Sequence, residues 1–473
     1  MTRTEPLTVA GIDVGTSGLK ACLVTVVGGD VHIEGIESVA YLGDGTPTRD
    51  PQTWVAVARD ALAMVTAGRR IDAVGVTGQM HGLVPVAGGK PVRDTLLWND
   101  YDGADALDRF CAAHPELPLV PRTGNIPLPD FTLAKWLHLV ECDPSAIGAV
   151  ERLPAAKDFV RDELSTITDP VTDVNDASGT QYFDPFRVTW DLEIVRAAAI
   201  PGSALVPVLR PATIVGTMRP GLGADGAQVV VGTGDQHAAA RALGADLSGR
   251  ASLSLGTSGV LGIGTRLDRL PSGWDGSLHL FPTGAPSMFQ VIATVPAFGS
   301  TLRWVADALG VPLDDLGTLA EAGRADVVRF YPFLGGSGAP HPDATKRAEF
   351  RGLGEDSTRA DLARAVIDGL ANEIASLIAG VRERGVAIDD LVMSGGPSML
   401  APLVTAIAAR LDMPLSRSSV RDASAVGAAL LAADGLGGGD HPVCERLTVP
   451  AADHVLPSPQ WLDERAAILG LSS

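Results

Sequence analysis

The tetrapeptide Gly-Thr-Ser-Gly occurs twice in this chain, at residues 15–18 and again at residues 256–259. Each copy directly follows a short β-prone run, residues 7–12 in the first case and 251–255 in the second. A glycine-flanked turn lets main-chain N–H groups converge on an anion, and the Thr and Ser hydroxyls add further donors. The repeated tetrapeptide therefore indicates phosphate chemistry.

Both copies are predicted to form the tip of a β-hairpin. In the first, residues 7–12 enter, 19–27 leave, and the tip carries Asp13, Gly15, Thr16, Ser17 and Lys20. In the second, residues 259–264 form the leaving strand after a turn at Gly256, Thr257 and Ser258. A single glycine-rich hairpin often only turns a corner, but two alike, about half a chain apart, predict an internally duplicated fold.

Length and composition restrict the class of protein. A chain of 473 residues is expected to form two or more domains, and we place the boundary near Gly244, giving domains 1–243 and 244–473. A formal net charge of −19 argues against nucleic acid or an anionic membrane as a main partner and favours small metabolites. The sequence leaves a homodimer open.

The cysteines and the apolar runs point to a cytoplasmic protein. Four cysteines without any CxxC spacing suggest neither a zinc site nor a disulfide framework, which fits a reducing cytosol. No apolar stretch approaches the roughly 18 residues of a membrane span, and nothing marks the chain for export.

Strands and helices are expected to alternate in an α/β pattern. Further strands are predicted at residues 71–76, 94–97, 229–231 and 391–393. Helices are predicted at 51–67, 131–140, 192–199, 235–243, 295–308, 359–384, 398–411 and 422–433, and residues 435–440 as a surface loop. Polar residues cluster just after the predicted strands, where ligands of open α/β sheets usually bind.

Phosphoryl transfer from a nucleotide needs phosphate donors, a divalent cation and a base for the acceptor hydroxyl. Asp13 ends the first strand beside the first loop and is a candidate Mg²⁺ ligand, although it could be a turn residue. Asp235 follows a strand and two glycines that would hold its carboxylate open, as a general base requires. Asp235 could also serve as the N-cap of the next helix.

Two other segments are candidates for binding a sugar. Gln79, Met80 and His81 could bond hydroxyls and pack on a carbon face, although a histidine in such a turn is often structural. Trp98, Asn99 and Asp100 could supply an apolar platform and two polar groups, although Trp98 could equally be a core residue. Gly395 and Gly396, after a strand, would let a flat heterocycle approach the backbone, or would simply turn it.

Taken in order, these segments resemble the FGGY family of carbohydrate kinases, from Gly11 to about Ala432. Residues 348–368 fit the second signature of the family throughout. The first signature is partial: Phe131, Thr132, Lys135 and Trp136 fit, but His138 stands where tryptophan is usual. Residues 79–82, Gln-Met-His-Gly, are typical of the xylulokinase branch, which sedoheptulose kinases resemble there.

The resemblance implies a two-domain, actin-like, ribonuclease H-like α/β fold with ATP in a cleft between the domains. It assigns Asp13 and Asp235 to the Mg²⁺ site and Asp235 to the catalytic base. It places the sugar at Met80 and His81, the phosphates at Gly15, Thr16, Gly256, Thr257 and Ser258, and the adenosine at Gly395 and Gly396. The implied reaction is phosphorylation of D-xylulose to D-xylulose 5-phosphate by MgATP.

Several departures from the family pattern lie near the pocket and leave the substrate open. Tyr101 and Asp102 stand where glycine and arginine are usual, and Gln236 replaces asparagine after the base. Residues 334–340 lack two charged groups, and Met399 occupies a position that is usually polar.

Other functions remain open from the sequence. The rival enzyme is a kinase for another ketose or polyol, of the ribulose, sedoheptulose or erythritol type. A degenerate kinase fold acting as a sensor would have no need of both Asp13 and Asp235. An actin-like or chaperone ATPase would explain neither residues 79–82 nor the second signature.

Overall fold

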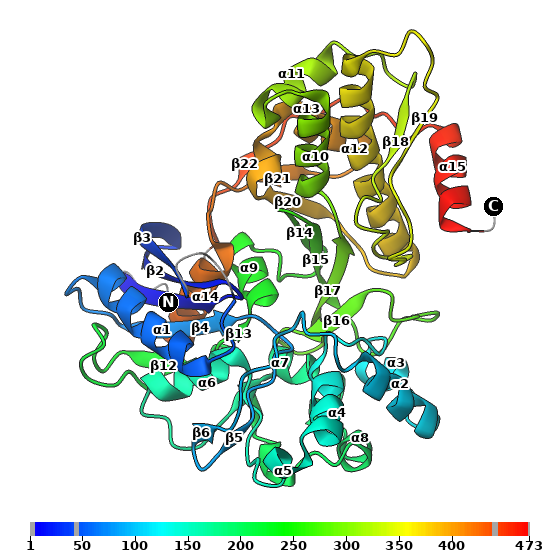
Figure 1. Cartoon of the computed structure of the whole chain (residues 1–473). Helices are drawn as coiled ribbons and strands as arrows, with labels where there is room; N and C mark the ends of the chain where they lie inside the picture. The colour runs from blue at the N-terminus through cyan, green and yellow to red at the C-terminus, as the bar shows by residue number, and fades with distance from the viewer. Residues whose placement is uncertain (1–4, 42–46, 438–442, 472–473) are drawn as a thin grey trace.

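The computed structural model describes residues 5–41, 47–437 and 443–471. Two seven-stranded sheets organise the molecule, one in each half of the chain (Figure 1). The first runs in the order β11-β12-β4-β1-β2-β3, with β13 paired to β4. Its strands are β1 Leu7–Val14, β2 Gly18–Val27, β3 Asp30–Ala40, β4 Ala73–Gly78, β11 Ile214–Thr217, β12 Gln228–Val230 and β13 Thr233–Gly234.

The second sheet runs in the order β16-β17-β15-β14-β20-β21-β22. Its strands are β14 Arg250–Leu255, β15 Gly259–Arg266, β16 His279–Pro282, β17 Met288–Val295, β20 Asp390–Ser394, β21 Leu415–Arg417 and β22 Leu447–Thr448. Four short strand pairs complete the β-structure: β5 Val86–Ala87 with β6 Lys90–Pro91, β7 Thr172–Asp173 with β10 Val208–Leu209, β8 Phe183–Asp184 with β9 Thr189–Trp190, and β18 Arg329–Tyr331 with β19 Glu349–Arg351.

The two large sheets repeat one topology. In the first, the antiparallel strands β1, β2 and β3 lie beside β4, which is parallel to β1. In the second, the antiparallel strands β14, β15 and β17 lie beside β20, which is parallel to β14. The β1–β2 and β14–β15 hairpins carry the two Gly-Thr-Ser loops, so the predicted internal duplication is confirmed.

Helices cover the sheets and fill the segment between residues 79 and 212. Those of the first half are α1 Pro51–Thr66, α2 Ala104–Ala113, α3 Leu119–Thr123, α4 Thr132–Cys142, α5 Pro144–Ile147, α6 Ala156–Leu164, α7 Val174–Ser178, α8 Leu192–Ala197 and α9 Asp235–Leu243. Those of the second are α10 Gly299–Leu309, α11 Leu316–Glu321, α12 Arg359–Glu383, α13 Ala401–Arg410, α14 Ala423–Gly435 and α15 Pro459–Leu469. Among the described residues, no helix has the length and apolar character needed to cross a membrane.

Helix α14 comes late in the sequence yet packs on the first sheet. Its alanine-rich surface contacts β1, β4 and α9. Gly11 of β1 and Gly75 of β4 allow this approach, because a Cβ atom on either would lie 2.0 Å from a carbonyl oxygen of α14. The boundary near Gly244 remains a proposal, since the first sheet takes one of its covering helices from beyond it.

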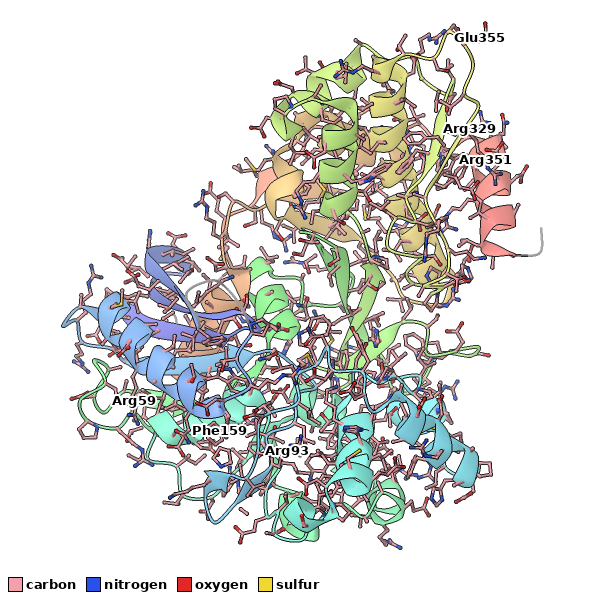
Figure 2. The ribbon with its side chains drawn as sticks, in the orientation of Figure 1. Arg59, Arg93, Phe159, Arg329, Arg351 and Glu355 are labelled. Atoms are coloured by element: carbon pink, nitrogen blue, oxygen red, sulfur yellow. The ribbon has the colours of Figure 1, made fainter. Side chains whose placement is uncertain are left out.

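The C-terminal helix α15 docks on the second half through the buried Trp461, which packs on Tyr331 and Phe333, and through polar pairs. Arg329 pairs with Glu464 at 2.9 Å, and the Tyr331 hydroxyl donates to the same carboxylate. Arg351 lies over the Tyr331 ring, 5.5 Å from its centre. Figure 2 shows Arg329 and Arg351 beside the C-terminal helix. A buried pair between Arg465 and Glu373 joins α15 to α12.

Some predicted elements differ from the structure. Residues 94–97 form no strand, because their only bridge is Leu96 with Leu83. The helix predicted at 295–308 begins at Gly299, because Val295 still pairs with Gly259 in β17 and precedes a proline, which disfavours helical backbone. Of residues 435–440, predicted as a surface loop, Gly435 ends α14 and 438–440 lie outside the described residues.

Substitution of Gly75 by alanine tests the contact between α14 and the sheet. Gly75→Ala would force the Ala428 carbonyl away from β4. We expect a loss of roughly 3 kcal/mol in unfolding free energy, typical of overpacking, and a fall in Tm of roughly 6 °C. Gly202→Ala is the control, because no heavy atom lies within 4 Å of its added Cβ. Equal Tm values for the two variants would contradict the role of this contact.

Candidate active site

The first Gly-Thr-Ser loop joins β1 to β2 and is held from two sides. The Gly15 carbonyl accepts a hydrogen bond from the Tyr41 hydroxyl at 3.0 Å. The Thr16 hydroxyl accepts one from the Trp98 indole at 2.9 Å and donates one to Gln79 at 3.3 Å. The structure therefore brings together three residues predicted from separate segments, while Ser17 is exposed at the loop tip.

Asp13 lies at the end of β1 and is buried, with 7 % of its surface exposed. Its Oδ2 atom accepts a hydrogen bond of 2.5 Å from Ser424, near the start of α14. Its Oδ1 atom is buried without a hydrogen-bond partner in the described part of the chain. Burial raises the pKa of Asp13 more than the Ser424 hydroxyl lowers it. One oxygen of this carboxylate is thus free for a ligand.

Lys20 lies opposite Asp13 in the register of β1 and β2. Its ammonium group lies 2.5 Å from the Asp422 carboxylate. Asp422 precedes α14 and has a left-handed backbone, with φ 56°. The start of α14 therefore supplies partners to the two charged candidate residues of the first hairpin, Asp13 and Lys20.

Asp235 is the first residue of α9, and Gly234 is the N-cap. The alternative of Asp235 as the N-cap is therefore wrong, because Gly234 holds the extended conformation (ψ 152°) from which the helix starts. Burial, and next the negative charge of Asp13, raise the pKa of Asp235 from 3.8 to about 7. Such a carboxylate gains or loses a proton near neutral pH, as a general base must.

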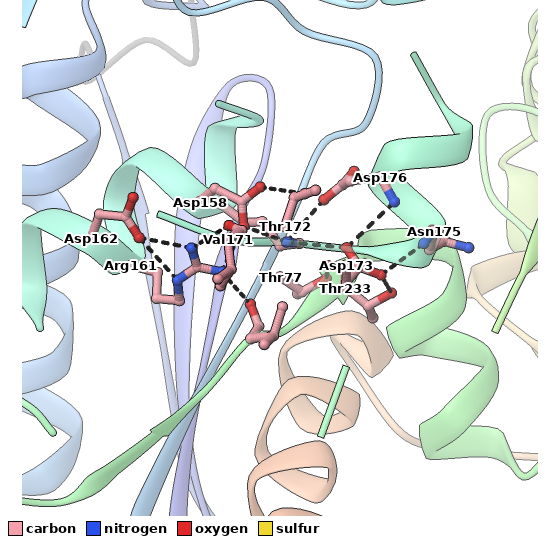
Figure 3. A network of polar contacts seen from close by, with 12 residues as sticks. Thr77, Asp158, Arg161, Asp162, Val171, Thr172, Asp173, Asn175, Asp176 and Thr233 are labelled. Carbon is pink, nitrogen blue, oxygen red and sulfur yellow. Dashed lines mark hydrogen bonds and ion pairs between the residues drawn. The ribbon is translucent and has the colours of Figure 1, made fainter. Parts of the chain in front are cut away.

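The segment before Asp235 is fixed by hydrogen bonds to two elements (Figure 3). Thr233 pairs with Thr77 of β4, whose hydroxyl donates to the Thr233 carbonyl at 2.6 Å. The Thr233 hydroxyl in turn donates to Asp173 at 2.8 Å. Asp173 also caps α7 by accepting hydrogen bonds from the backbone of Asn175 and Asp176. The backbone that presents Asp235 is therefore anchored to both β4 and α7.

Lys157 is the buried cation of this network. Its ammonium group lies 2.6 Å from Asp158, 3.1 Å from Asp173 and 3.2 Å from Asp176. Burial alone would lower the pKa of Lys157, but the three carboxylates raise it above its usual value. Arg161 adds a second buried cation, 2.7 Å from Asp158. Because two cations face several carboxylates, the charges beneath the site are largely paired.

Met80 and His81 lie between the two halves of the molecule. Met80 packs in an apolar cluster with Phe131 and Phe281. His81 has a left-handed backbone, with φ 66°, and its Nδ1 atom lies 3.0 Å from the Gly179 carbonyl, to which it can only donate. Burial lowers the pKa of His81 to about 3, so the ring is neutral and its Nε2 atom is an acceptor. This arrangement suits recognition of a hydroxyl group.

The segment from Trp98 to Asp100 is more exposed than a core segment. Trp98 is 39 % exposed, which contradicts the alternative of a core residue, and Asn99 is also exposed. Arg49 donates two hydrogen bonds to the Asp100 carboxylate, and the Leu97 amide donates a third at 2.7 Å. Burial would raise the pKa of Asp100, but these donors lower it.

Arg49 bears on one of the departures from the family pattern. Asp102 is exposed at the position where arginine was expected. Arg49 reaches the same segment from the chain just before α1 and places a guanidinium group on Asp100. The segment therefore retains a cation, although from a different part of the sequence.

A cavity of about 670 Å³ lies between the halves. Its walls include Lys20, Asp235 and Gln236 from the first half and Gly395 and Gly396 from the second. Gly395 has φ 87°, and a Cβ atom there would lie 2.1 Å from the Leu255 carbonyl, so this turn requires glycine. Met399, 66 % exposed, also lines the cavity.

The second Gly-Thr-Ser loop docks on the start of α10. The Gly256 carbonyl accepts a hydrogen bond from the Gly299 amide, and the Thr257 carbonyl accepts one from Phe298. Arg303 donates to the Thr257 hydroxyl at 3.3 Å. Gly256, Thr257 and Ser258 lie outside the lining of the 670 Å³ cavity, as do Gly15, Thr16 and Ser17, so neither Gly-Thr-Ser loop forms part of this cavity wall.

The sequence reasoning missed several residues of this site, among them Ser424, Asp422 and Lys157. An aspartate and a serine at the start of a small-residue helix are a usable signal for the first two, since helix starts often face anions or carboxylates. Lys157 carries no such signal, because its three acidic partners come from different elements.

Family models match both halves of the chain. Residues 8–242 match the N-terminal domain of the FGGY family of carbohydrate kinases, and residues 251–435 match its C-terminal domain. The chain belongs to the FGGY family. This FGGY kinase is 31 % identical to the xylulose kinase of Streptomyces coelicolor over 96 % of this chain and 94 % of that protein.

Solved structures confirm the expected actin-like, ribonuclease H-like fold. The crystal structure of a xyloylose kinase from Brucella ovis matches with a TM-score of 0.84 at 26 % identity, covering 98 % of this chain and 97 % of that one. Plasmodium falciparum glycerol kinase with ADP matches equally well, with a TM-score of 0.84 at 18 % identity, covering 98 % and 97 %. The protein is a xylulokinase-like carbohydrate kinase by sequence, and its fold is shared by kinases of other substrates.

The raised pKa of Asp235 predicts a stability gain when this carboxyl is replaced. Between pH 3.8 and about 7 the folded protein binds the extra proton, so stability falls as the pH rises through this window. At pH 8, Asp235→Asn removes the cost of an ionised buried carboxylate, and we expect Tm to rise by roughly 2 °C or more. At pH 5 the gain shrinks, because the native carboxyl is already protonated.

Calorimetry of the nucleotide-free protein in EDTA measures this effect. Asp60→Asn, on the exposed face of α1, is the matched control and should leave Tm unchanged at both pH values. A lower Tm for Asp235→Asn than for wild type at pH 8 would show that ionised Asp235 does not destabilise the folded protein.

Proposed function

We propose that this kinase phosphorylates D-xylulose with ATP, giving D-xylulose 5-phosphate and ADP. The observation that carries the proposal is the position of Asp235. It stands on a fixed helix start, with its pKa raised to about 7, in the wall of a cavity that also holds Lys20 and the Gly395 turn. Similarity to xylulose kinases along nearly the whole chain supports the choice of sugar.

In the proposed reaction, Asp235 acts as the general base. Its carboxylate takes the proton of the acceptor hydroxyl, and the sugar oxygen attacks the γ-phosphorus of ATP. The bond from the γ-phosphorus to the bridging oxygen breaks, and ADP leaves with that electron pair. Lys20 balances the charge of the phosphates once they replace Asp422 as its partner.

Asp13 and Asp235 are the residues proposed to hold Mg²⁺. The Asp13 Oδ1 atom fits this role, because it is a buried carboxylate oxygen without a hydrogen-bond partner in the described chain. When bound, the ion would neutralise charge on the phosphate oxygens. Ser424 orients the carboxylate by its hydrogen bond to the other oxygen.

We assign the remaining sequence-predicted residues to the two substrates. The sugar would lie against Met80 and His81, with Gln79, Trp98, Asn99, Asp100 and Gln236 around it. The phosphates of ATP would lie near Gly15, Thr16, Ser17, Gly256, Thr257 and Ser258, and its adenosine near Gly395 and Gly396. The cytoplasmic location and the homodimer stay predictions.

A second candidate function is phosphorylation of another ketose or polyol. It is favoured by Gln236, which lines the cavity next to Asp235 and is one methylene longer than the usual asparagine. A hydroxyl bonded by this side chain must lie further from the helix. Ribulose, sedoheptulose and erythritol are the alternatives to test.

The test measures ADP release from MgATP with D-xylulose, L-xylulose, D-ribulose, sedoheptulose, erythritol and glycerol, and without any acceptor. We expect the highest kcat/KM with D-xylulose. Asp235→Asn should bind ATP normally but lose at least ~1,000-fold in kcat, since general bases typically contribute 10²–10⁴-fold.

Each other outcome has a definite meaning. Activity on only one of the other acceptors would move the function to that substrate. Substantial turnover by Asp235→Asn would remove the assignment of the base. ADP release that is independent of any acceptor would replace the sugar kinase by an ATPase.

A further inference from the structure

Strand β16 of the second half places two ring side chains next to His81, which belongs to the proposed sugar-binding residues 79–81 of the first half. Leu280 points into the core of the second half and is fully buried. Since side chains alternate along a strand, His279 and Phe281 must lie on the other face. Their partners in β17, Ile292 and Gln290, share this face, and Gln290 lines the 670 Å³ cavity.

Three ring contacts fix this face against the first half. Phe281 lies 5.7 Å from the His81 ring, between ring centres, and 6.3 Å from Phe131. His279 lies 5.8 Å from Phe131 and is stacked on Phe281 at 6.2 Å. His279 thus belongs to the same group of rings as His81, although 198 positions separate them in the sequence.

Hydrogen bonds from the first half hold β16 in this position. The Asn125 side chain donates to the Leu280 carbonyl at 3.0 Å and accepts from the Leu280 amide at 2.9 Å. Asn175 of α7 donates to the Pro282 carbonyl at 3.3 Å. Figure 1 shows β16 reaching down from the second sheet to α7. The orientation of His279 is therefore set from both sides.

One ring nitrogen of His279, Nδ1, is buried without a partner. It neither donates nor accepts a hydrogen bond within the described residues. Asn175 Oδ1, close to Gly234 and Met80, is likewise buried without a partner. Buried polar groups are nearly always satisfied in folded proteins, so unpaired atoms beside a binding site point to a ligand.

We propose that His279 is a sugar-binding residue supplied by the second half of the chain, its Nδ1 atom pairing with a hydroxyl remote from the one that is phosphorylated. The inference rests on the proposed function, because its ligand is the sugar acceptor of that reaction.

The position of His279 on the second sheet fits a hydroxyl remote from the one that is phosphorylated. Gln290 donates to the Gln236 carbonyl at 3.1 Å, so this part of β17 adjoins the residue that follows Asp235. His279 pairs with Ile292, two residues further along β17, which is about 7 Å along the strand. This separation is on the order of the length of a five-carbon sugar chain.

The chemistry of the ring suits an uncharged hydroxyl. Burial lowers the pKa of His279 to about 4, so the imidazole is neutral at pH 7 and can donate or accept at Nδ1. The neighbouring rings of Phe131 and Phe281 provide an apolar surface for the carbon atoms of the sugar.

The experiment compares His279→Leu with His279→Asn. Leucine removes the polar atom, whereas the asparagine amide can occupy roughly the place of Nδ1. For His279→Leu we expect the Kd of D-xylulose, measured by calorimetry on the nucleotide-free protein, to rise about 10–100-fold, as for loss of a buried hydrogen bond. The KM of the sugar should rise in parallel, whereas the KM of ATP and the Tm should stay unchanged. His279→Asn should recover most of the affinity for the sugar.

His32→Leu, on the exposed strand β3, is the matched control.

Deoxy analogues of the sugar identify the hydroxyl. The analogue that lacks the paired group should bind wild type and His279→Leu equally, while other analogues keep the difference. Sugar affinity unchanged in His279→Leu, or a loss shared equally by every analogue, would overturn the proposal.

The binding and turnover measurements separate this inference from the proposed function. If wild type phosphorylates D-xylulose and His279→Leu binds this sugar with unchanged affinity, only the proposed role of His279 is overturned. If wild type binds D-xylulose without turnover, the proposed phosphorylation of D-xylulose is overturned. The comparison of the His279 variants then still decides whether His279 contacts the sugar. Wild type that binds no sugar of the panel overturns both.

Discussion

The close contact between α14 and the first sheet is the constraint on which the site depends. Gly11 and Gly75 leave no side chain between the strands and the helix, so the backbone of α14 lies directly on the sheet. This approach brings Ser424 to Asp13 and Asp422 to Lys20. A helix held further from the sheet would leave Asp13 and Lys20, the charged candidate residues of the first hairpin, without these partners.

Charge in this site is arranged at two depths. The lower layer is the Lys157 network, in which buried cations face carboxylates and the Thr233 segment is fixed. The upper layer is the pair of Asp13 and Asp235, whose pKa values are raised by burial. The fold thus pairs charges where the backbone before Asp235 is fixed, and leaves the two carboxylates that we propose as base and Mg²⁺ ligands less stabilised in their ionised form. Such a division costs stability at the upper layer, as is common where sites are built for reaction.

Much of the fold and the candidate site could be predicted from local sequence. The two hairpins follow from β-prone runs around glycine-rich turns, and helix α12 follows from its length and its Thr358 and Asp361 capping box. Asp13, Gln79 and Asp235 were found because each lies at, or shortly after, the end of a predicted strand. The chain could not reveal α14 as a part of the first sheet, or Arg49 as the partner of Asp100, because these contacts join segments far apart in the sequence. The strand predicted at residues 94–97 fails for a related reason: strands require partners, and only Leu83 is available to it.

The position of α14 also affects how this chain is synthesised and folded. The face of the first sheet that carries Val9, Val24 and Val26 is covered by α14, whose last residue is Gly435. On the ribosome, that apolar face stays open until α14 has been made, roughly 420 residues after β1. The first half is therefore unable to complete its core alone while it emerges, and exposed strands of this kind are prone to aggregate until they are covered. Synthesis of α14 therefore covers a sheet whose strand β1 was made much earlier.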